Sequence, residues 1–84
     1  MAFTYILYSE TLNKYYIGST EETIEERLKK HLSNHKGFTA KAKDWKLIYY
    51  ELYPDKKSAL AREKQIKAWK SRKHIEVLIS SKSS

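Results

Sequence analysis

Residues 3–18 read FTYILYSETLNKYYIG, and this stretch decides the fold. Its first part, Phe3 to Tyr8, is aromatic and aliphatic, as is typical of a strand. Ser9 to Asn13 is polar and turn-forming, and Lys14 to Gly18 is again rich in aromatic and aliphatic residues. Two short apolar runs joined by a polar turn predict a β-hairpin.

The element predicted next is a helix from Thr23 to about Ser33. Thr23 and Glu26 match a capping box, and isoleucine and leucine recur at helical spacing after it. A start at Ser19, with Glu22 as its partner, fits the same capping pattern. Both alternatives place a helix directly after the hairpin.

The second half of the chain predicts a third strand and a second helix. Residues 34–45 have no apolar period and should form a long basic loop. Lys46 to Tyr53 is a strong strand pattern that ends at Pro54. Asp55 then caps a helix that runs to about Lys70.

The last residues predict a short terminal helix, over 74–79, and a flexible polar tail, over 80–84. The element order is therefore ββαβα plus a short C-terminal helix. It predicts an α+β fold in one domain, residues 1–84, with a three-stranded, mainly antiparallel sheet and flanking helices.

Composition narrows the classes of function. The chain has 84 residues and no cysteine, so neither a disulfide framework nor a cysteine-based zinc site can support the fold. A glycine-rich phosphate loop, a His-Glu-x-x-His run and paired carboxylates of the glycosidase kind are all missing. The first residues lack a basic, apolar leader, so we expect a cytoplasmic protein with no membrane partner.

Charge points to a polyanionic partner. The formal net charge is +7 and the pI is about 9.6, which favours nucleic acid through neutralisation of phosphates. The charge is uneven, because Glu63 is the lone acid between Lys56 and Lys73. We expect this region to be the docking face.

Glu63 is the first residue at odds with a purely structural interpretation. On a helical wheel it falls between Ala59 and Ile66, on the half that should face the sheet. A carboxylate in that place needs a partner or a metal ion. The alternative is a surface glutamate that forms a salt bridge with Arg62 or Lys67.

Arg27 and His31 raise the same question on the first helix. They are four residues apart and border its apolar stripe, so they face one spot together. An arginine can hold a phosphate and a histidine can move a proton. The alternative is a solvated helix edge.

Tyr5 and Tyr16 lie on the two strands of the hairpin, and Gly18 ends the second strand, where a ligand backbone could approach closely. Tyrosines in strands are usually packing residues. By themselves they do not indicate catalysis.

In this order the elements resemble the GIY-YIG nuclease family over nearly the entire chain, particularly small stand-alone members related to the nuclease domain of bacterial excision repair. The first family motif maps on Phe3-Thr4-Tyr5 and the second on Tyr16-Ile17-Gly18. Arg27 to His31 resembles the arginine and histidine segment, and Ala61 to Lys70 the segment with the metal-binding glutamate. The first motif lacks its glycine, and Ser19 stands where some relatives have lysine, a role that Lys41 or Lys43 could take.

The resemblance implies one-metal hydrolysis of phosphodiesters. Glu63 would bind Mg²⁺ or Mn²⁺, and Tyr16 would help to deprotonate the attacking water. Arg27 would neutralise charge in the transition state, Tyr5 would orient water or phosphate, and His31 would relay a proton or hold Tyr16.

The substrate implied is nucleic acid, with DNA favoured and a role in repair or recombination. A partner protein could supply specificity. The residues expected to contact nucleic acid are Gly18, Lys41, Lys43, Lys64, Lys67 and Lys70. The rival interpretation is a non-catalytic basic module that binds DNA or RNA.

Overall fold

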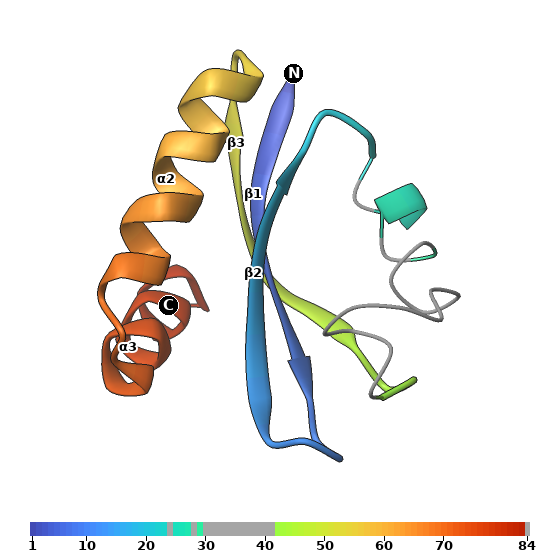
Figure 1. The fold of residues 1–84 in the computed structure, drawn as a ribbon, viewed down its shortest axis with the longest axis vertical. Coiled ribbons are helices and arrows are strands. Elements are labelled where there is room, and N and C mark those ends of the chain that lie inside the picture. Colours follow the sequence, from blue (N-terminus) through green and yellow to red (C-terminus); the bar gives the residue numbers. More distant parts are fainter. Residues whose placement is uncertain (24, 28, 30–41, 84) are drawn as a thin grey trace.

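The computed structural model describes residues 1–23, 25–27, 29 and 42–83. Its elements are β1 (Ala2–Ser9), β2 (Lys14–Thr20), β3 (Lys46–Tyr53), α2 (Lys56–Ala68) and α3 (Arg72–Ser83) (Figure 1). The predicted α+β fold is confirmed, with a three-stranded antiparallel sheet and helices beside it. Within the described residues, no helix has the length and apolar character needed to cross a membrane.

The sheet has the order β2-β1-β3, so the first strand of the hairpin is central and β2 is an edge strand. Tyr5 in β1 pairs with Gly18 in β2 and with Tyr50 in β3. The β1–β3 register shifts between Ile6 and Leu7, which marks a bulge. The central strand is the most deeply buried because both of its neighbours and both faces cover it.

Each face of the sheet carries its own apolar cluster, because alternate residues of a strand point to opposite faces. Ile6 and Tyr49 pack with Ile66 of α2 on one face. Tyr5 packs with Trp45 on the other. Figure 1 shows α2 and α3 together on the first side and the segment after β2 on the second.

The second helix begins where the sequence predicts. The Asp55 side chain accepts a hydrogen bond of 2.7 Å from the backbone N–H of Ser58, which is the contact expected of an N-cap. The helix ends at Ala68 rather than at Lys70, because Lys70 adopts a left-handed backbone with φ of 50°. The Thr4 hydroxyl donates to the Ala59 carbonyl at 2.6 Å and ties the first turns of α2 to β1.

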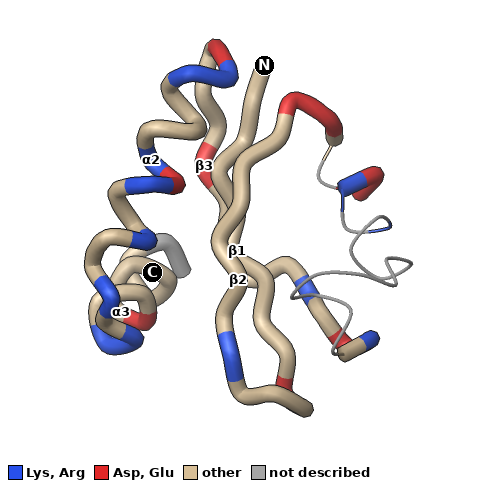
Figure 2. The backbone as a smooth tube through the Cα atoms, viewed as in Figure 1, with Lys and Arg blue, Asp and Glu red and all other residues tan. Residues whose placement is uncertain are grey.

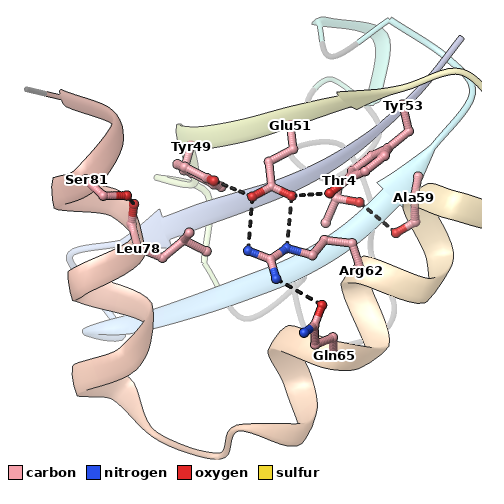
Figure 3. Close-up of polar contacts among 9 residues, drawn as sticks. All are labelled: Thr4, Tyr49, Glu51, Tyr53, Ala59, Arg62, Gln65, Leu78 and Ser81. Atoms are coloured by element: carbon pink, nitrogen blue, oxygen red, sulfur yellow. Dashed lines mark hydrogen bonds and ion pairs between the residues drawn. The ribbon is translucent and has the colours of Figure 1, made fainter.

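A polar network fixes the rotation of α2 against the sheet (Figure 3). The Glu51 carboxylate on β3 accepts from both Tyr49 and Tyr53 and from the Arg62 guanidinium, whose Nε lies 3.0 Å away. Burial alone would raise the pKa of Glu51, but the three donors outweigh burial and lower it. Arg62 therefore pairs with Glu51, so of the two partners that the alternative interpretation offers for Glu63, Arg62 or Lys67, Arg62 is not the one.

Asp44 joins the segment before β3 to the hairpin turn. It accepts from the Ser9 hydroxyl at 2.6 Å and from the Thr11 backbone N–H at 2.9 Å. These bonds, that of Ser9 first, lower the pKa of Asp44 to about 2. The Asp44 carboxylate thus ties the segment before β3 to the end of β1 and the hairpin turn.

Two further predictions of element boundaries need correction. Ser19 lies within β2, so the alternative helix start there is wrong, whereas Thr23 does accept from the Glu26 N–H at 3.2 Å and residues 25–27 and 29 are helical. The terminal helix, α3, is longer than the 74–79 predicted and includes residues 80–83 of the expected tail. The remainder of the first helix and residues 34–41 of the long loop lie outside the described residues, whereas residues 42–45 are described and belong to no helix or strand.

Candidate active site at the β2 edge

The Tyr5 ring passes directly over Gly18. Tyr5 is 1% exposed, and a Cβ placed on Gly18 would lie 2.5 Å from its hydroxyl oxygen and 2.7 Å from Cζ. Real Cβ atoms do not approach other atoms so closely, so the glycine is needed for Tyr5 to lie there. Tyr5 thus makes a close approach at Gly18, and the contact of Gly18 with a nucleic-acid backbone stays a prediction.

Arg27 holds the hydroxyl end of Tyr5. Its Nε donates to the Tyr5 oxygen at 3.1 Å, so the segment after β2 supplies a cation to the sheet. Burial raises the pKa of Tyr5 and outweighs the opposing effect of Arg27. The hydrogen bond to Tyr5 raises the pKa of Arg27. At neutral pH the site thus contains a protonated phenol and a charged guanidinium.

Tyr16 borders the same glycine from its own strand. Its Cε1 would lie 3.2 Å from a Cβ on Gly18, and its half-buried ring meets Trp45 edge to face with 6.3 Å between centroids. Trp45 is 2% exposed, so it gives the Tyr16 ring a rigid support. The structure brings the two tyrosines of the sequence motifs together at Gly18.

Glu63 reaches the sheet from α2, as the helical wheel predicts. Its side chain is 14% exposed. Ser19 of β2 donates to its Oε1 at 2.6 Å, and the Lys67 ammonium lies 2.6 Å from its Oε2. The alternative of a salt bridge to Lys67 is thus also correct, but the pair lies against the sheet edge.

The groups meet around the free edge of the sheet. Tyr5, Tyr16 and Arg27 approach Gly18 from the face opposite α2, and Glu63 holds the next residue, Ser19, from the α2 face. The Glu63 charge contributes to the raised pKa of Tyr5, after burial and Arg27, so the two halves interact electrostatically. Phenols, a guanidinium and a carboxylate are groups that can bind and polarise a phosphate, and here they approach the edge strand β2 from its two faces.

The donor set at Glu63 suits a hard divalent cation. A carboxylate and the neighbouring Ser19 hydroxyl are oxygen ligands, and the Lys67 ammonium shows that a cation is stabilised at this carboxylate. Within the described residues, no three His, Cys, Asp or Glu side chains converge. A metal ion held there would complete its coordination with water and substrate.

Other predicted site residues are placed as follows. Lys43, Lys64, Lys67 and Lys70 are exposed, in keeping with a role in contacting nucleic acid. Lys67 approaches Glu63, whereas Lys64 has no described contact with it. His31 and Lys41 lie outside the described residues.

Sequence reasoning missed two contributors to the site. The sequence offers Ser19 as an alternative helix start and as the replacement of a lysine, but not as a partner of Glu63, although its position beside Thr4 in the register puts it on the face that α2 covers. Trp45 was assigned to a loop, and its support of Tyr16 depends on a contact between segments far apart in the chain. A strand register for the hairpin would have identified Ser19, whereas no local pattern would have identified Trp45.

Comparison with known protein families gives a match over residues 1–76, described as the GIY-YIG catalytic domain. Comparison with curated proteins gives no match. Comparison with solved structures gives none either. The match spans both tyrosine motifs, Arg27 and Glu63, which the structure gathers at the β2 edge. The chain therefore belongs to the GIY-YIG family and is a nuclease-type domain.

Proposed function

We propose that this protein is a metal-dependent endonuclease that hydrolyses phosphodiester bonds of DNA at the β2 edge. The observation that carries the proposal is the meeting of Tyr5, Tyr16, Arg27 and Glu63 around Gly18 and Ser19. A structural role alone does not require a buried phenol bonded to an arginine beside a half-buried carboxylate.

Glu63 would hold Mg²⁺ or Mn²⁺, with Ser19 fixing the orientation of its carboxylate. Such an ion polarises a phosphoryl oxygen and lowers the pKa of bound water. A divalent ion would replace the Lys67 ammonium, whose side chain is half-exposed and can turn to solvent.

The remaining groups divide the work of hydrolysis. Tyr16 would help to deprotonate the attacking water, and His31 is expected to relay the proton or to hold Tyr16. The water oxygen bonds to phosphorus, the bond to the leaving oxygen breaks, and that oxygen takes a proton from solvent. Arg27 stabilises the added negative charge, and the buried Tyr5 hydroxyl, which accepts from the Arg27 Nε, holds this guanidinium in place.

A repair or recombination role and a partner protein that supplies specificity are part of this proposal. They rest on the resemblance to small stand-alone members of the family and on the net charge of +7, which suits binding to the DNA backbone without base readout.

Nicking of a supercoiled plasmid tests the proposal. The parent should convert plasmid to the open circle with Mg²⁺ or Mn²⁺ and not in EDTA, and Glu63→Gln should abolish conversion. Glu10→Gln is the matched control, because Glu10 is an exposed glutamate in the hairpin turn, and it should retain the parent's rate.

A non-catalytic basic module is the second candidate, and the salt bridge between Lys67 and Glu63 favours it. In that case the parent would bind plasmid without nicking it in either metal, and Glu63→Gln would lower the melting temperature. Both readouts come from the same protein preparations.

A further inference from the structure

One row of residues across the sheet is polar on the face that α2 covers. Ser19 of β2, Thr4 of β1 and Glu51 of β3 are partners in the strand register, so they form one line across the three strands. All three have hydrogen bonds to α2. Neighbouring strands lie about 4.8 Å apart, so the ends of the row are about 10 Å apart, which matches the width of a helix. The outer two residues therefore reach α2 from its two sides.

The outer bonds hold consecutive residues of α2. Arg62 bonds to Glu51 on the β3 side, and Glu63 bonds to Ser19 on the β2 side. Consecutive helical residues point about 100° apart around the axis, so one is directed to each edge of the sheet. A roll of α2 about its axis in either direction would carry at least one of these side chains away from its partner. The two bonds together thus fix the direction in which the Glu63 carboxylate points.

Arg62 is held firmly enough to act as one of these two anchors. Its Nε and Nη2 bond to the Glu51 carboxylate at 3.0 and 3.3 Å, and its Nη1 donates to Gln65 at 2.9 Å. Its guanidinium also lies over the Trp69 ring, 5.5 Å from the centroid. An arginine that is bonded through several nitrogens and stacked on a ring has little freedom to move. Figure 2 shows an acidic position of β3 facing the middle of α2, where this ion pair forms.

Stability alone does not call for an ion pair at this place. The side chains of Glu51 and Arg62 are 19% and 21% exposed, and apolar residues of similar volume often stabilise a fold as well as an ion pair withdrawn from water does. Hydrogen bonds depend on direction, so a satisfied polar network defines one arrangement of its elements more strictly than apolar packing. The ion pair therefore suits a task that depends on orientation.

We propose that Arg62 and Glu51 are positioning residues for the metal ion. Through their ion pair they set the rotation of α2 and keep the Glu63 carboxylate beside Ser19, in the arrangement that binds a divalent cation. Their effect on the cation passes through Glu63 and not through a contact of their own. The inference rests on the proposed function, because that function assigns the metal ion to Glu63.

The test removes the ion pair without leaving either charge alone, so the net charge stays the same. The network variant is Glu51→Gln/Arg62→Met, in which glutamine can still accept a hydrogen bond and methionine keeps an apolar stem beside Trp69. The matched control is Arg72→Met/Glu76→Gln, the same two exchanges at an ion pair of α3. Thermal melting gives a temperature at which the parent and both variants are fully folded, and all measurements are made there.

Two readouts report on Glu63 without nucleic acid. Electron paramagnetic resonance of free Mn²⁺ gives the Kd for this ion, and Glu63→Gln gives the background from other carboxylates. Nuclear Overhauser contacts between the Glu63 γ protons and the Ser19 β protons report whether their bond persists, and they need no metal ion.

The network variant should bind Mn²⁺ about tenfold more weakly than the parent, which is the smallest loss expected when residues that orient a metal ligand are removed. Its Overhauser contact between Glu63 and Ser19 should weaken as well. Half-maximal nicking of plasmid should need about ten times more Mn²⁺ than the parent needs. The control variant should keep the parent's Kd and the parent's Overhauser contact.

Either readout unchanged in the network variant would overturn the proposal. An unchanged Kd would mean that the ion pair does not serve the metal ion, and a weaker Kd with an unchanged contact would mean that it does not act by position. An equal loss of Mn²⁺ affinity in the control variant would overturn it too, because the loss would then follow from stability in general.

The same samples separate this inference from the proposed function. If the parent binds Mn²⁺ and nicks plasmid, but the network variant matches it in both readouts, the inference fails alone. If the network variant shows both expected losses and the parent does not nick plasmid, the proposed function fails alone. A parent that binds no Mn²⁺ would overturn both.

Discussion

Replacing Gly18 by alanine should damage both stability and activity through one steric contact. The added Cβ would lie 2.5 Å from the Tyr5 oxygen and 2.7 Å from its Cζ. Tyr5 cannot easily move aside, because its ring is 1% exposed and packs against Leu7 and Trp45. The ring must therefore shift, and the 3.1 Å bond from Arg27 to its hydroxyl shifts with it.

The change in the free energy of unfolding caused by Gly18→Ala combines two opposing contributions. Overpacking a buried site costs about 1 to 3 kcal/mol. Losing the flexibility of glycine in the unfolded chain returns about 0.4 to 1 kcal/mol. The free energy of unfolding of Gly18→Ala should therefore be about 1 to 2 kcal/mol lower than that of the parent. For a domain of this size, such a loss lowers the melting temperature by about 4 to 16 °C.

Thermal melting of four proteins measures this contact. Gly18→Ala and Tyr5→Phe should each be less stable than the parent, the second because the bond to Arg27 is lost. Their combination should be more stable than the sum of the single losses predicts, because removing the hydroxyl relieves the closer of the two contacts. A Gly18→Ala protein as stable as the parent, or strict additivity, would refute the steric reasoning.

Three further predictions follow from other contacts. Tyr16→Phe keeps the ring against Trp45 and should leave the melting temperature unchanged while reducing cleavage by about a hundredfold; full activity would remove Tyr16 from the chemistry. Arg62→Met leaves the Glu51 carboxylate without its cation and should cost about 2 to 3 kcal/mol in urea unfolding at pH 7. The pKa of Glu51 is lowered in the folded state. The stabilisation that the charged carboxylate provides is therefore present above its unfolded pKa of about 4.3, and it is lost as the pH falls through the folded pKa. A loss of stability in Arg62→Met that is equal at pH 7 and at pH 2 would contradict this. Asp44→Asn should lower the melting temperature at pH 7. Because the folded pKa of Asp44 is about 2, the difference in melting temperature from the parent should disappear between about pH 4 and pH 2. A constant difference across that range would show that the charge of Asp44 does not stabilise the fold.

Much of the fold follows from local patterns. The hairpin and β3 have uninterrupted aromatic and aliphatic runs, and Pro54 with Asp55 marks the change from strand to helix. The length of α3 was not predictable, because residues 80–83 have no apolar period. The end of α2 depends on the left-handed backbone of Lys70, which lysine does not signal.

The site was predictable only in part, for a physical reason. Helical periodicity is enough to turn Glu63 toward the sheet, and its Lys67 partner is one turn away. The bonds from Ser19 to Glu63 and from Arg27 to Tyr5 join residues 44 and 22 positions apart. Such contacts depend on strand register and on packing of separate elements, which a single sequence does not encode locally.

The central claim is that Glu63 holds the metal ion used in cleavage. The most direct test measures the melting temperature and the cleavage rate of the same samples over a range of Mn²⁺ concentrations. A ligand that binds only the folded state at ten times its Kd stabilises it by about 1.4 kcal/mol, or several degrees. Mn²⁺ should raise the melting temperature of the parent and activate cleavage over the same concentration range, and Glu63→Gln should lose both responses while folding as well as the parent. A parent whose melting temperature does not respond to Mn²⁺, together with a Glu63→Gln protein that unfolds, would make Glu63 a structural partner of Ser19 and Lys67 and contradict the account.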